Sequence, residues 1–351
     1  MIRRLLVASL AAVASAVTLR AVARRGAERL LAAPRTAPGE AELGAALDAL
    51  GGEVVRLRSR DGLRLSGRWL AAEPDADPDW VRDPHEAIVL LHGWSGSIAP
   101  HLVEYGPFLR RTAGVLGLDF RGHGASDAAP TTFGLREVED VAGALAWLGE
   151  RGVERVALVG MSMGAMTAIA AVAVLGDGSL PRVDADPAAP AHVAPPRRPR
   201  IVAVVADSAA PELVVAAAPL IPGPRPRMVA GWLFDAASRT LGGDPRDTEP
   251  IRVVRLLDGV DLLLVSGAED PIVPIADARR LAAAAPAGSE HWIVPGAGHR
   301  GAHATDAAGY ESRVTGHLRS AFASARESGP IIPSPGRLSA DSSYPAGSVE
   351  D

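Results

Sequence analysis

Hydrophobic and polar residues follow two different patterns along this chain. Residues 53–58 and 63–70 alternate between polar and apolar positions, and Asp61 and Gly62 lie between them. Alternation with a period of two is typical of half-buried strands, and an Asp-Gly pair favours a hairpin turn. Six later runs are mostly apolar without alternation, as in strands of a parallel sheet covered on both faces. These runs are residues 87–91, 114–120, 155–159, 201–206, 262–265 and 291–294.

Between the predicted strands the apolar spacing becomes helical. In residues 135–149, for example, apolar side chains recur every three or four positions, which is the period of an α-helix. We predict helices over residues 99–112, 135–149, 165–175 and 303–325. Because strands alternate with helices, we expect an α/β fold. It should contain a mostly parallel eight-stranded sheet with helices on both faces and an antiparallel hairpin at its start.

The first 25 residues differ from the rest of the chain. An uncharged, mostly apolar run extends from Leu5 to Leu19, with arginines before it and after it. This pattern predicts that residues 1–25 are a signal peptide or a membrane anchor. We therefore expect an exported or membrane-anchored protein, with a cytoplasmic location as the alternative. Residues 26–52 are predicted to form a more polar, helical linker.

The remaining residues are expected to form one domain with two additions and a tail. The domain covers residues 53–325, and residues 210–250 form a short cap segment in which prolines separate two helical pieces. Residues 176–200 are rich in Pro, Ala and Asp and predict an irregular insertion. Residues 326–351 are rich in Ser, Pro and Gly and are predicted to be a disordered tail.

Composition excludes several classes of function. The chain has 351 residues and a formal net charge of -5, so it lacks the basic character that nucleic-acid binding requires. It has no cysteine, which excludes disulfides, thiolate catalysis and cysteine-based metal sites. The sequence contains no glycine-rich phosphate loop. We therefore predict neither a metal nor an organic cofactor.

The sequence Gly160-Met161-Ser162-Met163-Gly164 separates a predicted strand from a predicted helix. A serine between a strand and a helix lies on a very tight turn with a strained backbone. Glycine two positions before and after the serine removes side chains that would clash in this turn. We therefore predict that Ser162 is a nucleophile at the end of the strand, beside the free N–H groups of the helix.

Together with four other motifs, this turn resembles the serine hydrolases of the α/β-hydrolase fold over roughly residues 53–325. The motifs are His92-Gly93-Trp94, residues 119–127 (DFRGHGASD), residues 160–164, residues 267–274 (GAEDPIVP) and residues 296–299 (GAGH). The resemblance implies a catalytic acid and a histidine that follow the serine in that order.

The catalytic base is predicted to be His299, which lies in a glycine-rich loop after the last predicted strand. A serine hydroxyl needs such a base near neutral pH, and the base needs a carboxylate to fix its tautomer. Asp270 is the preferred acid, because the resemblance favours its Asp-Pro-x-x-Pro context. Glu269 and Asp207, which follows an earlier predicted strand, remain alternatives.

An oxyanion hole requires two N–H groups directed at the developing negative charge. The backbone of Met163, directly after the nucleophile, is predicted to supply one. Trp94 is predicted to supply the other, with Ser95 as an alternative. His92 and His123 are expected to support turns rather than to act as bases.

These residues predict a hydrolase that cleaves a carboxylic ester through an acyl-enzyme. An amide or peptide hydrolase with the same triad is the second hypothesis, because prolyl aminopeptidases and oligopeptidases also resemble the sequence. A catalytically silent, membrane-tethered binding protein is the third. The expected partner is a small-molecule acyl substrate. Apolar cap residues either line its pocket or pack the cap onto the core, namely Leu220, Ile221, Met228, Val229, Trp232, Leu233 and Phe234.

Overall fold

The computed structural model describes residues 21, 23–32, 40–73, 80–94, 96–176 and 198–328. Most of the predicted signal peptide or anchor, most of the predicted insertion and most of the predicted tail lie outside these residues. Within the described residues, no helix combines the length and apolar character needed to cross a membrane.

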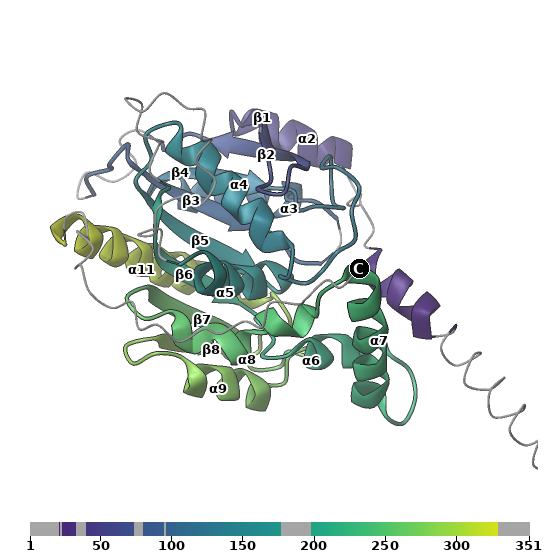
Figure 1. Ribbon diagram of the computed structural model, residues 1–351. Coiled ribbons are helices and arrows are strands. Elements are labelled where there is room, and N and C mark those ends of the chain that lie inside the picture. Colours follow the sequence, from purple (N-terminus) through teal and green to yellow (C-terminus); the bar gives the residue numbers. More distant parts are fainter. Residues whose placement is uncertain are drawn as a thin grey trace, which may run out of the picture.

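One eight-stranded sheet forms the centre of the fold (Figure 1), in the order β1-β2-β4-β3-β5-β6-β7-β8. β1 pairs with β2 and β2 with β4 in antiparallel fashion, and all other neighbours are parallel. The strands are β1 (Glu53–Arg58), β2 (Arg64–Leu70), β3 (Glu86–Leu91), β4 (Gly114–Leu118), β5 (Arg155–Met161), β6 (Arg200–Asp207), β7 (Asp261–Gly267) and β8 (Glu290–Val294). The predicted eight-stranded, mostly parallel sheet is therefore confirmed.

Helices cover both faces of the sheet. One face carries α2 (Glu40–Ala49), α3 (Ala99–Leu109), α10 (Ala302–Thr305) and α11 (Ala307–Glu327), and the opposite face carries α4 (Glu137–Gly149), α5 (Met163–Leu175), α8 (Pro250–Val253) and α9 (Ile275–Ala284). The middle strands are buried along almost their whole length, which explains their continuously apolar sequences. β1, at one edge of the sheet, alternates between exposed and buried positions.

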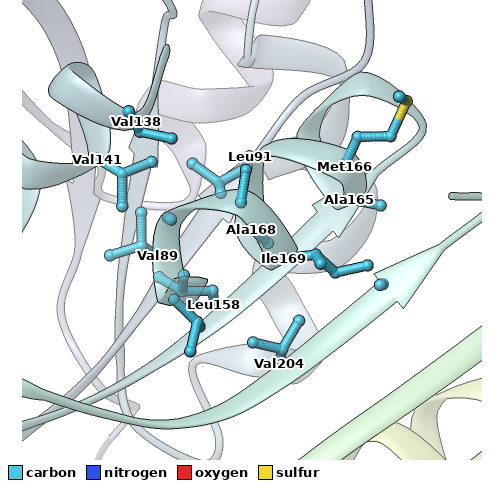
Figure 2. Close-up of a cluster of buried hydrophobic side chains, with 14 of the residues drawn as sticks. Val89, Leu91, Val138, Val141, Leu158, Ala165, Met166, Ala168, Ile169 and Val204 are labelled. Carbon is cyan, nitrogen blue, oxygen red and sulfur yellow. The ribbon is translucent and has the colours of Figure 1, made fainter. Parts of the chain in front are cut away.

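The core between the sheet and α5 fixes the start of that helix. Figure 2 shows apolar side chains of β3, β5 and β6 packed under α5 and α4. The labelled residues are Val89, Leu91, Val138, Val141, Leu158, Ala165, Met166, Ala168, Ile169 and Val204. Burying each larger side chain of this kind stabilises the fold by roughly 1.5–3 kcal/mol. The junction between β5 and α5 is thus held by packing on both sides.

The cap segment consists of short helices beyond the ends of β6 and β7. They are α6 (Leu213–Ala217), the 3-10 helix η1 (Ala218–Leu220), α7 (Pro226–Leu241), and the 3-10 helices η2 (Pro245–Thr248) and η3 (Val254–Leu256), which lie on either side of α8. The helical residues 23–31 lie against α7 (Figure 1). Ala27 and Leu31 are buried there with Ala236 and Ala237.

The structure corrects two predictions of helices and adds one helix that was not predicted. Residues 26–52 do not form one helical linker, because residues 23–31 are helical, residue 32 is not, and α2 begins at residue 40. The prolines at 34 and 38 each lack the N–H that a continuous helix needs. The predicted helix over 303–325 is divided at Asp306, whose side chain accepts a hydrogen bond from Gly309 N–H and so begins α11. α9 was not predicted, since only Ala278 and Leu281 of its residues are buried.

Candidate active site

Ser162 lies in a strained turn between β5 and α5, as its sequence context predicts. Its backbone has φ 54° and ψ -113°, a conformation that costs a non-glycine residue roughly 1–3 kcal/mol. A Cβ atom added at Gly160 would lie 2.3 Å from the carbonyl oxygen of Gly164. One added at Gly164 would lie 2.2 Å from the carbonyl oxygen of Leu91. Both glycines are therefore required by close backbone approach.

The side chains of Ser162, His299 and Asp270 form one chain of hydrogen bonds. Ser162 Oγ lies 2.9 Å from His299 Nε2, and His299 Nδ1 lies 2.7 Å from Asp270 Oδ2. Because a carboxylate only accepts hydrogen bonds, Nδ1 carries the proton and Nε2 is free to accept from the serine. The other carboxylate oxygen accepts the N–H groups of Ile272 (2.7 Å) and Val273 (2.9 Å), which fixes its orientation.

The two alternative acids lie in different surroundings. Glu269 is exposed to solvent. Asp207 is completely buried at the end of β6, and its carboxyl accepts hydrogen bonds from the hydroxyls of Ser208 (2.8 Å) and Tyr310 (3.1 Å). Burial raises the pKa of Asp207 to about 6, although these two hydrogen bonds lower it. The carboxylate that contacts His299 is that of Asp270.

His92 fixes the turn that follows β3. The N–H of Phe120 donates to Nε2 of His92 (3.1 Å), so the proton of this neutral ring lies on Nδ1, which donates to the carbonyl oxygen of Gly93 (2.6 Å). Complete burial and the nearby His123 ring hold the pKa of His92 well below its ordinary value. In a planar trans peptide the C=O and N–H point in opposite directions. The N–H of Trp94 therefore points away from the His92 ring.

Of the two predicted oxyanion donors, Met163 directly follows Ser162, and Trp94 follows Gly93, where an added Cβ atom would lie 3.5 Å from Cβ of Ser162. Met163 is the first residue of α5, so its N–H has no acceptor within the helix. Trp94 follows the Gly93 peptide that His92 orients, and its side chain packs partly buried against the core. The alternative donor, Ser95, lies outside the described residues.

The motif at residues 119–127 braces neighbouring turns rather than supplying a base. Asp119 accepts the N–H groups of Ile98 (2.8 Å) and Ala125 (3.1 Å), which ties the loop after β3 to the loop after β4. Arg121 is buried and pairs with both Asp61 and Asp140. This ion-paired cluster holds the hairpin, the loop after β4 and α4 together.

Arg300 is the site residue that sequence reasoning missed. It directly follows His299, and its side chain approaches the turn at Gly93. Its position next to the predicted base was the one available signal. Its neighbours in space, His101 and Ser208, are far from it in the sequence.

The cap leaves part of its apolar surface exposed. Leu220, Met228 and Trp232 are exposed by 57%, 41% and 47%, whereas Phe234 is buried in the core. An open hollow in the cap is lined by Ala218, Pro219, Arg225, Pro226, Arg227 and Met228. Of the predicted cap residues, Phe234 therefore packs onto the core and Met228 lines the open hollow. Met161 and Met163, beside the nucleophile, are buried in the core.

The described residues contain no cluster of three or more His, Cys, Asp or Glu side chains arranged to hold a metal ion. What the geometry offers chemically is a serine hydroxyl in contact with an imidazole that a buried carboxylate orients.

The comparison with protein families agrees with this geometry and topology. The model of the alpha/beta hydrolase family matches residues 88–312. The chain belongs to this family. As an alpha/beta hydrolase it is similar to the Salmonella typhi relative named "Uncharacterized protein YfhR", at 25% identity over 256 residues, 70% of this chain and 74% of that one. The relative of the same name from Escherichia coli O157:H7 is 25% identical over 257 residues, 72% of this chain and 75% of that one.

Solved structures of other proteins share the fold of this alpha/beta hydrolase. The Pyrococcus furiosus esterase Pf2001 superposes with a TM-score of 0.56 at 21% identity, over 79% of this chain and 95% of that one. The esterase RhEst1 from Rhodococcus sp. ECU1013 gives a TM-score of 0.51 at 19% identity, over 76% of this chain and 99% of that one. Est1E from Butyrivibrio proteoclasticus, solved with ferulic acid bound, gives a TM-score of 0.53 at 16% identity. The match covers 77% of this chain and 100% of that one.

Proposed function

We propose that this alpha/beta hydrolase cleaves carboxylic esters through an acyl-enzyme on Ser162. The observation that carries the proposal is the unbroken hydrogen-bonded chain from Ser162 Oγ through His299 to Asp270. In such a chain the imidazole accepts the serine proton, and the carboxylate keeps the imidazole in the required tautomer. Several structural neighbours are themselves named esterases, which favours an ester over an amide.

The reaction has two halves that use the same groups. Ser162 Oγ attacks the carbonyl carbon while its proton moves to Nε2 of His299. The N–H groups of Trp94 and Met163 stabilise the oxyanion, and His299 then protonates the departing alkoxide. Water enters, loses its proton to His299 and releases the acid from Ser162. Asp270 stays ionised and stabilises the imidazolium in both halves.

A fluorophosphonate probe and a panel of aryl esters test this proposal. The probe should label the wild-type protein, label Ser162→Ala not at all and label His299→Ala weakly. Ser320→Ala, on the exposed side of α11, is the matched control and should label like the wild type. No labelling of folded wild-type protein would contradict the proposal and favour the binding-protein hypothesis. Faster cleavage of aminoacyl amides than of esters would favour the peptidase hypothesis.

We also propose that residues 1–25 export the protein or attach it to a membrane. The apolar run flanked by arginines supports this proposal. The helical residues just after it pack on the cap through Ala27 and Leu31. Mass spectrometry of the protein from its native host, together with membrane fractionation, tests it. A protein with an intact N-terminus in the soluble fraction would contradict both export with cleavage and attachment to a membrane.

A further inference from the structure

Arg300 occupies a constrained backbone position directly after the proposed base. Its φ of 56° lies in the left-handed region, which is uncommon for residues with a side chain. Its N–H donates to the hydroxyl of Ser208 (2.9 Å), so the loop that carries His299 is anchored to the end of β6. The direction in which the Arg300 side chain leaves the backbone is thus set by the fold.

The guanidinium of Arg300 lies beside the proposed nucleophile. A Cβ atom added at Gly93 would lie 3.5 Å from Nη1 of Arg300 and 3.5 Å from Cβ of Ser162. Nη1 of Arg300 and Cβ of Ser162 are therefore separated by no more than twice 3.5 Å. Arg300 is exposed to solvent as a residue, and its guanidinium lies beside the turn at Gly93 that precedes the predicted oxyanion donor Trp94.

The side-chain contact that the structure gives this guanidinium is with an imidazole and not with a carboxylate. Nη1 lies 3.4 Å from Nε2 of His101, a buried residue of α3. Burial and the charge of Arg300 lower the pKa of His101 to about 4, so the imidazole is neutral near neutral pH and its Nε2 accepts the hydrogen bond from Arg300. Within the residues that the structure describes, no carboxylate forms an ion pair with Arg300. Other arginines of the domain, such as Arg121 and Arg155, have carboxylate partners.

We propose that Arg300 binds an anionic group of the substrate and that the preferred substrates are esters carrying a carboxylate near the scissile carbonyl. This inference rests on the proposed ester hydrolysis at Ser162. A guanidinium offers several N–H donors in a plane and binds a carboxylate through two parallel hydrogen bonds. The substrate anion would also offset the repulsion between Arg300 and the imidazolium that forms at His299 during the reaction. Arg300 should therefore affect both substrate binding and turnover.

A pair of matched esters tests the proposal. The charged ester is the para-nitrophenyl half-ester of adipic acid, and the neutral one is para-nitrophenyl heptanoate, in which an ethyl group replaces the carboxylate. We expect the wild type to prefer the half-ester in kcat/KM, after subtraction of spontaneous hydrolysis. Arg300→Gln should reduce the ratio of charged to neutral kcat/KM by about tenfold or more. Arg300→Lys should be intermediate, because it keeps the charge but not the planar donors.

The control is Arg279→Gln, which removes the same charge from an exposed position on α9 and should leave the ratio unchanged. An unchanged ratio in Arg300→Gln would overturn the proposal while leaving ester hydrolysis intact. An equal loss on both esters would also overturn it, since Arg300 would then support the loop or the oxyanion and not a substrate anion.

Binding to an inactive variant separates this inference from the proposed function. Calorimetry measures the Kd of the half-ester for Ser162→Ala and for Ser162→Ala combined with Arg300→Gln. We expect about tenfold weaker binding in the double variant. If the wild type hydrolyses no ester, the ester proposal fails and this comparison still decides whether Arg300 holds an anion. Equal Kd values in the two variants would overturn the Arg300 inference.

Discussion

Replacing Asp207 by asparagine should stabilise the protein increasingly as the pH rises. Asp207 is completely buried at the end of β6 and receives hydrogen bonds from the hydroxyls of Ser208 and Tyr310. Asparagine has nearly the same shape, and its carbonyl can accept the Ser208 hydroxyl while its amide donates to Tyr310. The substitution therefore removes the ionisation and keeps most of the packing.

The magnitude follows from the pKa of the buried carboxyl. Burial raises the pKa of Asp207 from its ordinary value of 3.8 to about 6. Between these values the folded protein holds a proton that the unfolded chain has lost, so stability falls as the pH rises through this window. A difference of about two in pKa corresponds to about 3 kcal/mol above pH 6. Below pH 4 the carboxyl is protonated in both states and the cost disappears.

The assay is urea unfolding followed by tryptophan fluorescence, for wild type and Asp207→Asn, at several pH values. The difference in the free energy of unfolding should shift in favour of Asp207→Asn by roughly 2 kcal/mol between pH 4.5 and pH 7.5. Other groups titrate alike in both proteins and cancel from the difference. The matched control is Asp261→Asn, at an exposed carboxyl that begins β7, which water solvates in both states. Its difference from wild type should not change with pH.

The reasoning would be refuted if the difference in the free energy of unfolding between Asp207→Asn and wild type stayed constant with pH. It would also be refuted if that difference shifted in favour of the wild type as the pH rises. Turnover provides a second comparison, because Asp207 was an alternative for the catalytic acid. Asp207→Asn should keep kcat within about tenfold of wild type, whereas Asp270→Asn should lose about 10⁴-fold if Asp270 holds the tautomer of His299. The reverse order would make Asp207 the acid.

Three other substitutions address the turns around the site. Gly164→Ala should prevent folding or lower the free energy of urea unfolding by several kcal/mol, because the new Cβ would collide with the backbone of β3. The control is Gly316→Ala on α11, where a Cβ meets nothing. It should be neutral or stabilising by up to about 1 kcal/mol. A Gly164→Ala variant of normal stability would contradict the close approach of Gly164 to the backbone of β3. His92→Gln should lower kcat by about 10²- to 10³-fold with little change in KM, if His92 orients an oxyanion donor. A change in KM alone would contradict that role. Arg121→Met should cost about 3–5 kcal/mol by leaving Asp140 buried without its partner. Near-normal stability would show that the pair contributes little.

The sequence predicted those parts of the fold that depend on local pattern. Six strands were predicted from apolar runs, because strands in the middle of a parallel sheet are buried on both faces, and the two strands of the hairpin were predicted from alternation. Ser162 and His299 were found because each lies in a glycine-rich turn after a strand. Parallel strands end at one edge of the sheet, so such turns meet there without knowledge of any distance.

Features that depend on contacts between distant residues escaped prediction. α9 buries too few side chains to show a clear helical period. The choice between Asp270, Glu269 and Asp207 needed the distances themselves, because all three follow predicted strands. Nothing in the sequence near Arg300 indicates that its guanidinium returns to the turn at Gly93.

The end of β6 joins the buried Asp207 to the loop that carries His299 and Arg300. The hydroxyl of Ser208 donates to the Asp207 carboxyl and accepts the N–H of Arg300, so a buried acid and the loop carrying His299 are joined through one side chain. Asp207, one of the alternatives for the catalytic acid, instead holds the hydroxyl of Ser208, which accepts the N–H of Arg300 in this loop. With its carboxyl satisfied by Ser208 and Tyr310, it forms no ion pair with the guanidinium of Arg300. Ser208 thus anchors the backbone of this loop through the N–H of Arg300, and within the described residues the guanidinium has no carboxylate in an ion pair, as the proposed binding of a substrate anion requires.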